Sequence, residues 1–193
     1  MREATGVARY HGMVVALHWL VAVLVIGNLA AGALLLEDLP NDAPEKAGLL
    51  RLHLATGLSI LVLMAVRLIA RLMTKAPASP HEAGPLRWVA RINHWALYLV
   101  VIAMLSTGLG MAQMAELFPL LEGAQVSLPE SFAELPPHAG HVLFSSVLLA
   151  LVALHVVAVG YHHWRGEKLL ARMWFGPRKA PGSSPQRQPA GSL

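Results

Sequence analysis

The stretch HAGHVLFSSVLLALVALHVVAVGYHHW, residues 138–164, is a long apolar run that carries several histidines. It holds no Asp, Glu, Lys or Arg, and it is longer than the roughly 20 apolar residues that a helix needs to cross a bilayer. Its His141, His155 and His162 are separated by fourteen and seven residues. A helix turns about 100° and rises about 1.5 Å per residue, so the three imidazoles lie on one stripe and the first two are about 21 Å apart. Imidazoles inside a membrane are costly unless they face the protein interior and find a partner, which makes these three residues functional candidates.

The composition of the whole chain is that of a membrane protein. Of its 193 residues, 55% are hydrophobic and 13% are charged, whereas soluble domains have a charged share of about 25%. The chain has no cysteine, which excludes disulfides, iron–sulfur clusters, thiolate-ligated haem, c-type haem attachment and cysteine-bound zinc. Histidine, with ten copies, is the strong metal ligand that remains. The net charge of +4 does not indicate a nucleic-acid partner, because the basic residues flank apolar runs, which membrane topology explains.

Three more apolar runs precede this stretch, and we expect each of them to form a transmembrane helix. The predicted spans are residues 13–36, 49–72, 88–114 and 139–164. A cleaved signal peptide is the alternative for the first run, which is however longer than the usual apolar region of about 7–15 residues. The sequence therefore predicts an all-α membrane protein, a four-transmembrane-helix bundle within residues 1–176 that contacts the lipid bilayer. Residues 177–193 have too few apolar side chains to bury and are expected to form a disordered cytoplasmic tail.

Lysine and arginine are distributed unevenly between the two sides of this predicted bundle. One side carries Arg2, Arg9, Arg67, Arg71, Lys75, Arg87, Arg91, Arg165, Lys168, Arg172, Arg178 and Lys179. The other side carries Lys46 and Arg51 among many acidic residues. Cytoplasmic loops hold the excess of Lys and Arg, so we expect both termini to be cytoplasmic.

Four histidines in the predicted spans form two pairs by depth. His18 and His155 lie nine and ten residues from the arginines that flank their spans on the cytoplasmic side, so they share a depth. His53 and His141 each lie seven residues from a charged residue on the opposite side and share a second depth. Two imidazoles on facing helices, one above and one below a flat macrocycle, are how a helix bundle holds b-type haem without covalent attachment. This pattern favours two haem sites, one at each depth.

Intramembrane histidines have other roles as well. A single one is more often a hydrogen-bonded packing or proton-relay residue than a metal ligand. A haem-free metal-ion or proton transporter would also use imidazoles, but it would more naturally bring Asp or Glu into the spans, and the four predicted spans contain none. The matched depths favour metal ligation over these alternatives.

Four segments carry a resemblance to a known family. They are LHWLVAVLVI (residues 17–26), LHLATGLSILVLMAVRL (52–68), INHWALYLV (92–100) and HAGHVLFSSVLLALVALHVVAVGYHH (138–163). Across most of its length the chain resembles the bacterial cytochrome b561 family, small four-helix dihaem membrane proteins that include a superoxide oxidase passing electrons to ubiquinone. The resemblance implies that His18 and His155 bind one haem b on the cytoplasmic side. It also implies that His53 and His141 bind a second haem b on the periplasmic side, in agreement with the depth argument.

His94 and His162 are candidates for a quinone site. Each lies three residues from an arginine, at a common depth just outside the layer of His18 and His155. Imidazoles can hydrogen-bond quinone oxygens and deliver protons, and the matching positions of the family look like a quinone site. Hydrated interfacial histidines are the alternative. Arg67 is predicted either to pair with a haem propionate or to extend to the cytoplasmic surface.

Two axial imidazoles occupy both open positions of iron, so such haems suit electron transfer rather than binding of substrate at the metal. We therefore expect a multi-pass protein of the bacterial inner membrane that transfers electrons between a periplasmic donor and the quinone pool, with no side chain as a catalytic residue.

If the protein is an enzyme, we expect it first of all to be a superoxide:ubiquinone oxidoreductase, with superoxide as the periplasmic donor. An anionic substrate is drawn by positive potential, however, and the predicted periplasmic loops are mostly acidic, with Lys46, Arg51 and His138 as the cationic exceptions. A protein donor is one alternative. Another is a larger oxidoreductase for which this chain is a non-catalytic, haem-bearing membrane subunit.

Overall fold

The computed structural model describes residues 9–74 and 85–176, and within these residues the secondary structure is helical, without a strand. The four long helices are α1 (Gly12–Ala31), α2 (Lys46–Met73), α3 (Pro85–Met114) and α4 (His138–Trp164). The segments long and apolar enough to cross a membrane are Gly12–Leu36, Lys46–Met73, Trp88–Met114 and His138–Trp164. The predicted fold class, an all-α protein with four transmembrane helices, is confirmed. The predicted tail at 177–193 lies outside the described residues.

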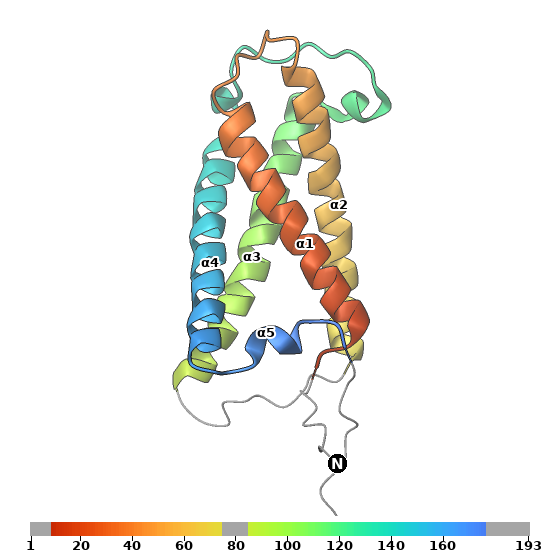
Figure 1. Ribbon diagram of the computed structural model, residues 1–193. Coiled ribbons are helices and arrows are strands. Elements are labelled where there is room, and N and C mark those ends of the chain that lie inside the picture. Colours follow the sequence, from red (N-terminus) through yellow and green to blue (C-terminus); the bar gives the residue numbers. More distant parts are fainter. Residues whose placement is uncertain (1–8, 75–84, 177–193) are drawn as a thin grey trace, which may run out of the picture.

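The four helices pack as two pairs. α1 packs mainly against α2, and α3 against α4, while contacts between α2 and α3 join the pairs; Figure 1 shows the resulting upright bundle. The central core takes apolar side chains from all four helices: Val21, Val25, Ile60, Met64, Tyr98, Val101, Met104 and Leu148. Many other large apolar side chains face outward, such as Val23 (66% exposed) and Val157 (68% exposed). Apolar surface of this extent is expected where lipid chains surround the bundle.

The two described ends of the chain meet at one end of the bundle, which we call the terminal end. The indole Nε1 of Trp19 on α1 donates to the carbonyl of Met173 at 2.7 Å. Arg9 Nη1 donates to three further carbonyls of the segment after α4, at 2.9, 3.1 and 3.2 Å. The short helix α5 (Leu169–Arg172) lies across this end. Both described ends are therefore on one side, and the assignment of this side to the cytoplasm stays a prediction from the distribution of Lys and Arg.

The opposite end of the bundle, which we call the loop end, carries the connectors 37–45 and 115–137 (Figure 1). There α1 continues into the π-helix η1 (Gly32–Leu36). The longer connector contains the 3-10 helices η2 (Phe118–Glu122) and η3 (Phe132–Glu134).

Lys46, the first residue of α2, is tied to the end of η1. Its side chain is buried, with the residue 4% exposed, and its Nζ donates to the carbonyls of Leu36 at 2.5 Å and Leu39 at 2.6 Å. Carbonyls at the end of a helix have no partner within the helix and need donors of this kind. The ammonium group of Lys46 therefore closes a helix end instead of facing an approaching substrate.

Candidate functional site

The structure brings the four span histidines together in two pairs. The ring centroids of His18 on α1 and His155 on α4 are 6.3 Å apart, with an angle of 72° between the ring planes. The ring centroids of His53 on α2 and His141 on α4 are also 6.3 Å apart, at an angle of 71°. α4 thus contributes one imidazole to each pair, as the sequence predicts. We call His18 and His155 the terminal-end pair, and His53 and His141 the loop-end pair.

The spacing of the rings fits one metal ion held between two imidazoles. A metal–imidazole bond is about 2.0–2.1 Å long and a ring nitrogen lies about 1.1 Å from its ring centroid, so two imidazoles that share a metal have centroids roughly 6.3 Å apart. The angle between the ring planes is free, because each ring can rotate about the line through the metal. Within residues 9–74 and 85–176, no group of three or more His, Asp or Glu side chains is placed to hold a metal ion. A pair of imidazoles at this spacing could hold the iron of a haem, whose macrocycle would supply the remaining ligands.

Neutral groups hydrogen-bond His141 in the loop-end pair. His141 Nδ1 lies 3.1 Å from the carbonyl oxygen of Met104 and 3.3 Å from Thr107 Oγ1. A carbonyl oxygen can only accept, so Nδ1 carries the ring proton and Nε2 keeps the lone pair that a metal needs. His53 Nδ1 is buried and has no hydrogen-bond partner in the described part of the chain. A mostly apolar groove of about 320 Å³ adjoins His53 between α1 and α2, and no residue of α4 lines it.

Helix α3 comes very close to His141 because residue 108 is glycine. A Cβ atom at Gly108 would lie 2.9 Å from His141 Cε1 and 3.3 Å from His141 Nδ1. The acceptors Met104 and Thr107 lie on the same helix within the preceding turn. Helix α3 therefore fixes the orientation of this imidazole by a hydrogen bond and by close packing.

A buried arginine contacts the terminal-end pair. Arg67 on α2 is 9% exposed, and its Nη2 lies 3.2 Å from His18 Nδ1. Its Nη1 donates to the hydroxyl of Tyr98 on α3 at 2.6 Å. The guanidinium thus points into the bundle, which supports the predicted role beside the cofactor over extension to the surface. Reasoning from sequence misses Tyr98, although its polar tip within the apolar segment INHWALYLV, one turn after His94, is a usable signal.

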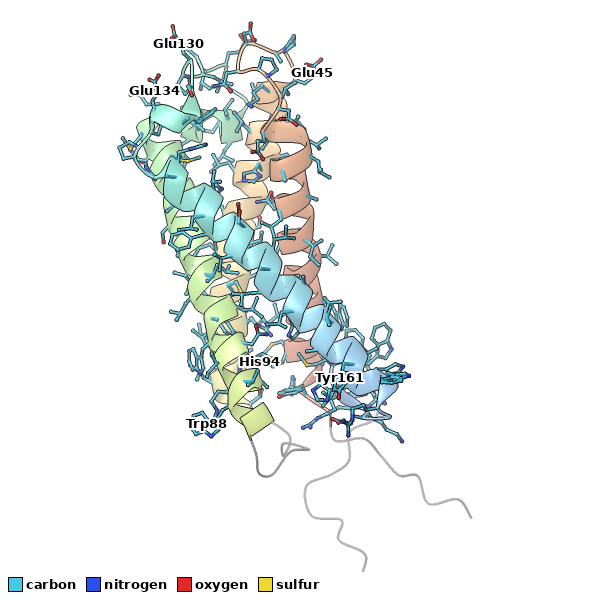
Figure 2. The ribbon with its side chains drawn as sticks, turned by 90° about the vertical axis from the view of Figure 1, so that its left-hand side faces the viewer. Glu45, Trp88, His94, Glu130, Glu134 and Tyr161 are labelled. Atoms are coloured by element: carbon cyan, nitrogen blue, oxygen red, sulfur yellow. The ribbon has the colours of Figure 1, made fainter. Side chains whose placement is uncertain are left out.

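The two candidate quinone-site histidines have different surroundings. His94 on α3 donates from Nδ1 to the carbonyl one turn earlier at 2.6 Å, and its ring centroid is 5.5 Å from that of His155. His162 Nδ1 lies 3.0 Å from Glu167 Oε2, a carboxylate just after α4. Figure 2 shows His94 and Tyr161, the neighbour of His162, toward the same end of the bundle. His94 therefore adjoins the terminal-end pair directly, while His162 faces the segment that follows α4.

Acidic side chains dominate the loop end. The exposed carboxylates there are Glu37, Asp38, Asp42, Glu45, Glu116, Glu122, Glu130 and Glu134, three of which are labelled in Figure 2. Of the few cationic residues predicted at this end, Lys46 is buried and donates to backbone carbonyls. Arg51 is exposed and donates to the carbonyl of Leu121 at 3.3 Å. The loop end thus presents a predominantly negative surface.

Comparison with known proteins identifies the family to which this chain belongs. The family model for prokaryotic cytochrome b561 matches residues 9–176 of this chain. A similar curated protein is the probable superoxide oxidase CybB of Yersinia pestis, 26% identical over 167 residues, which are 81% of this chain and 89% of that protein. Another is cytochrome b561 homolog 2 of Escherichia coli (strain K12), 29% identical over 102 residues, which are 50% of this chain and 51% of that protein.

Proposed function

Because this chain belongs to the prokaryotic cytochrome b561 family, and is therefore a multi-pass bacterial membrane protein that carries b-type haem and transfers electrons, we propose the following specific function. It is a dihaem cytochrome of the inner membrane that moves electrons between a donor at the loop end and ubiquinone at the terminal end. One haem b lies between His18 and His155, and the other lies between His53 and His141.

The observation that carries this proposal is the equal spacing of the two histidine pairs. Both centroid distances are 6.3 Å, a spacing compatible with two imidazoles that hold one metal ion between them. When bound, each haem would be held by the two imidazoles of its pair and would supply an iron that takes up or releases one electron. Family membership also favours this function over the haem-free transporter that the histidines alone leave open.

A hydrogen bond to the second ring nitrogen orients one of the proposed ligands, His141. The Met104 carbonyl takes the Nδ1 proton of His141 and so directs Nε2 to the metal, as partners of ligating histidines generally do. At His18 the group facing Nδ1 is Arg67, and a guanidinium can only donate. A His18 that ligates through Nε2 carries its proton on Nδ1, so Arg67 must then turn its N–H to another acceptor. A haem propionate supplies such an acceptor, which supports the role proposed for Arg67.

The acceptor site that we propose lies around His94 and His162. A quinone needs two electrons and two protons to become a quinol. The contact of His94 with His155 puts one hydrogen-bonding imidazole beside the terminal-end pair. The contact of His162 with Glu167 offers a carboxylate that can exchange protons with the surroundings. Together these residues suit a quinone that is reduced at the edge of the terminal-end haem.

Superoxide is the donor that the similarity to the Yersinia pestis protein suggests. Two superoxide anions would each give one electron and leave as dioxygen, while one quinone takes two electrons and two protons. The negative surface of the loop end opposes the approach of an anion, and Lys46 is buried against carbonyls. A cationic protein donor is therefore the second candidate, and the exposed carboxylates of the loop end are the observation that favours it.

Spectroscopy and rapid mixing of the purified, detergent-solubilised protein test the proposal. We expect reduced b-type bands and two haems per chain, with reduction of a soluble quinone when superoxide is mixed in. A chain with fewer than two haems would contradict the dihaem assignment. A dihaem protein that copurifies with a larger oxidoreductase and does not react with superoxide would support a haem-bearing subunit instead.

A further inference from the structure

The two histidine pairs differ in the charge of their neighbours. At the terminal end, the cationic Arg67 Nη2 lies 3.2 Å from His18 Nδ1. At the loop end, the neighbour of His141 Nδ1 is a neutral carbonyl that accepts its proton, at 3.1 Å. The two proposed haems therefore have the same axial ligands but different electrostatic surroundings.

Arg67 is held in the interior by a specific partner. Arg67 and Tyr98 are each 9% exposed, and the hydroxyl of Tyr98 accepts from Arg67 Nη1 at 2.6 Å. The guanidinium Cζ lies 5.3 Å from the Tyr98 ring centroid, a distance at which a cation is attracted to the ring face. Arg67 Nε is buried and has no hydrogen-bond partner among the described residues.

No carboxylate of the membrane spans balances this charge. The predicted spans contain neither Asp nor Glu. A buried positive charge without a carboxylate is costly in a medium of low dielectric constant. Its energy falls when a neighbouring group gains negative charge, which is what happens when an electron arrives on an adjacent haem.

We propose that Arg67, positioned by Tyr98, gives the haem between His18 and His155 a higher midpoint potential than the haem between His53 and His141. This inference rests on the proposed dihaem function. A fixed positive charge favours the ferrous state, which carries one positive charge fewer than the ferric state. At the loop end, donation from His141 to a carbonyl makes the imidazole a stronger ligand and favours the ferric state.

The direction of electron transfer follows from this difference. With both haems bound, one electron would pass from the haem held by His53 and His141, which would be oxidised, to the haem held by His18 and His155, which would be reduced. The donor of the proposed function would replace this electron at the loop end, and the quinone would take it up at the terminal end. A haem propionate paired with Arg67 does not change the sign, because without Arg67 its negative charge would disfavour the ferrous state.

Tyr98 acts through Arg67 and is a positioning residue. Without the phenolic hydroxyl, the guanidinium loses its shortest hydrogen bond. A flexible arginine side chain can then turn toward the terminal-end surface. Its effect on the terminal-end haem becomes smaller.

Potentiometric titration of the purified dihaem protein, followed by its optical spectrum, tests the proposal. In Arg67→Gln, we expect the ferrous-to-ferric ratio of the terminal-end haem at a fixed ambient potential to fall at least tenfold, a shift of about 59 mV. In Tyr98→Phe the same ratio falls by a smaller factor, at least about threefold. Arg67→Lys, which keeps the charge, should retain part of the wild-type potential. If Tyr98 acts only through Arg67, adding Tyr98→Phe to Arg67→Gln has no further effect.

An arginine–tyrosine pair at the surface provides the matched control. Arg165 Nη1 donates to the Tyr161 hydroxyl at 3.0 Å, and both residues are exposed. Tyr161→Phe should leave both potentials unchanged. A His53→Ala background, which should retain the terminal-end haem alone, assigns the shift to that haem.

Two outcomes would overturn the inference and leave the dihaem function standing. One is a protein with two haems whose potentials are unchanged in Arg67→Gln and Tyr98→Phe. The other is a shift of the loop-end haem instead. If Arg67→Gln fails to bind haem, Tyr98→Phe and Arg67→Lys decide. A purified wild-type protein without two b-type haems would instead remove the proposed function itself.

Discussion

The imidazole of His141 rests directly against Gly108, so closely that a methyl group at position 108 would lie 2.9 Å from His141 Cε1. The same helix supplies the Met104 carbonyl that fixes the ring nitrogen. The loop-end pair therefore depends on a small residue of α3 as much as on its two histidines.

Gly108→Ala should disturb the loop-end pair selectively. Overpacking of this kind typically costs about 1–3 kcal/mol, and here the displaced group is a proposed haem ligand. We expect the variant to lose most of the loop-end haem and to keep the terminal-end haem, as measured by haem content per chain. Gly160→Ala on α4, where a Cβ meets nothing within 4 Å, is the control. Equal haem content in both variants would contradict the prediction.

His94→Gln should separate haem binding from quinone reduction. The variant keeps both proposed ligand pairs, so its haem content and spectrum should equal those of the wild type. Loss of a proton donor or acceptor commonly slows a reaction by about 100-fold or more, and we expect quinone reduction to slow at least about tenfold. His163→Gln, an exposed histidine near the same end, should react normally. Quinone reduction at the wild-type rate in His94→Gln would exclude His94 from the acceptor site.

Lys46→Met should lower stability without changing the haems. The substitution leaves the part-buried carbonyls of Leu36 and Leu39 without this donor, and an unsatisfied group costs up to about 1–3 kcal/mol when it is fully buried. Thermal unfolding in detergent should therefore begin at a lower temperature than for Lys168→Met, a change at an exposed lysine. An unfolding temperature equal to that of the control would mean that the contact of Lys46 with η1 contributes nothing.

The charge of the loop end predicts how salt affects the two candidate donors. Salt at about 0.1 M screens charges beyond about 10 Å. If superoxide is the donor, the rate of haem reduction in stopped-flow experiments should rise with ionic strength, because screening weakens the repulsion. With a cationic protein donor it should fall. A superoxide reaction that slows with added salt would indicate a positively charged entry path and contradict the surface described above.

The fold and the histidine pairs are predictable from sequence for a simple physical reason. Bilayer thickness fixes the length of each span, so the distance of His18 or His53 from the end of its span gives its depth. Depth does not give the rotation of a helix about its axis. For this reason the sequence does not show that His94 on α3 adjoins His155 on α4, or that Arg67 on α2 contacts Tyr98 on α3. The sequence also does not show that Lys46 donates to the carbonyls of Leu36 and Leu39, because this contact depends on how the chain turns back after η1.

Haem content per chain in single-histidine variants shows whether each histidine pair holds one haem. We expect two haem b per wild-type chain, one in His155→Ala, one in His53→Ala and none in the double variant. The surviving haem should have the higher midpoint potential in His53→Ala and the lower one in His155→Ala. Retention of two haems in either single variant would contradict the account.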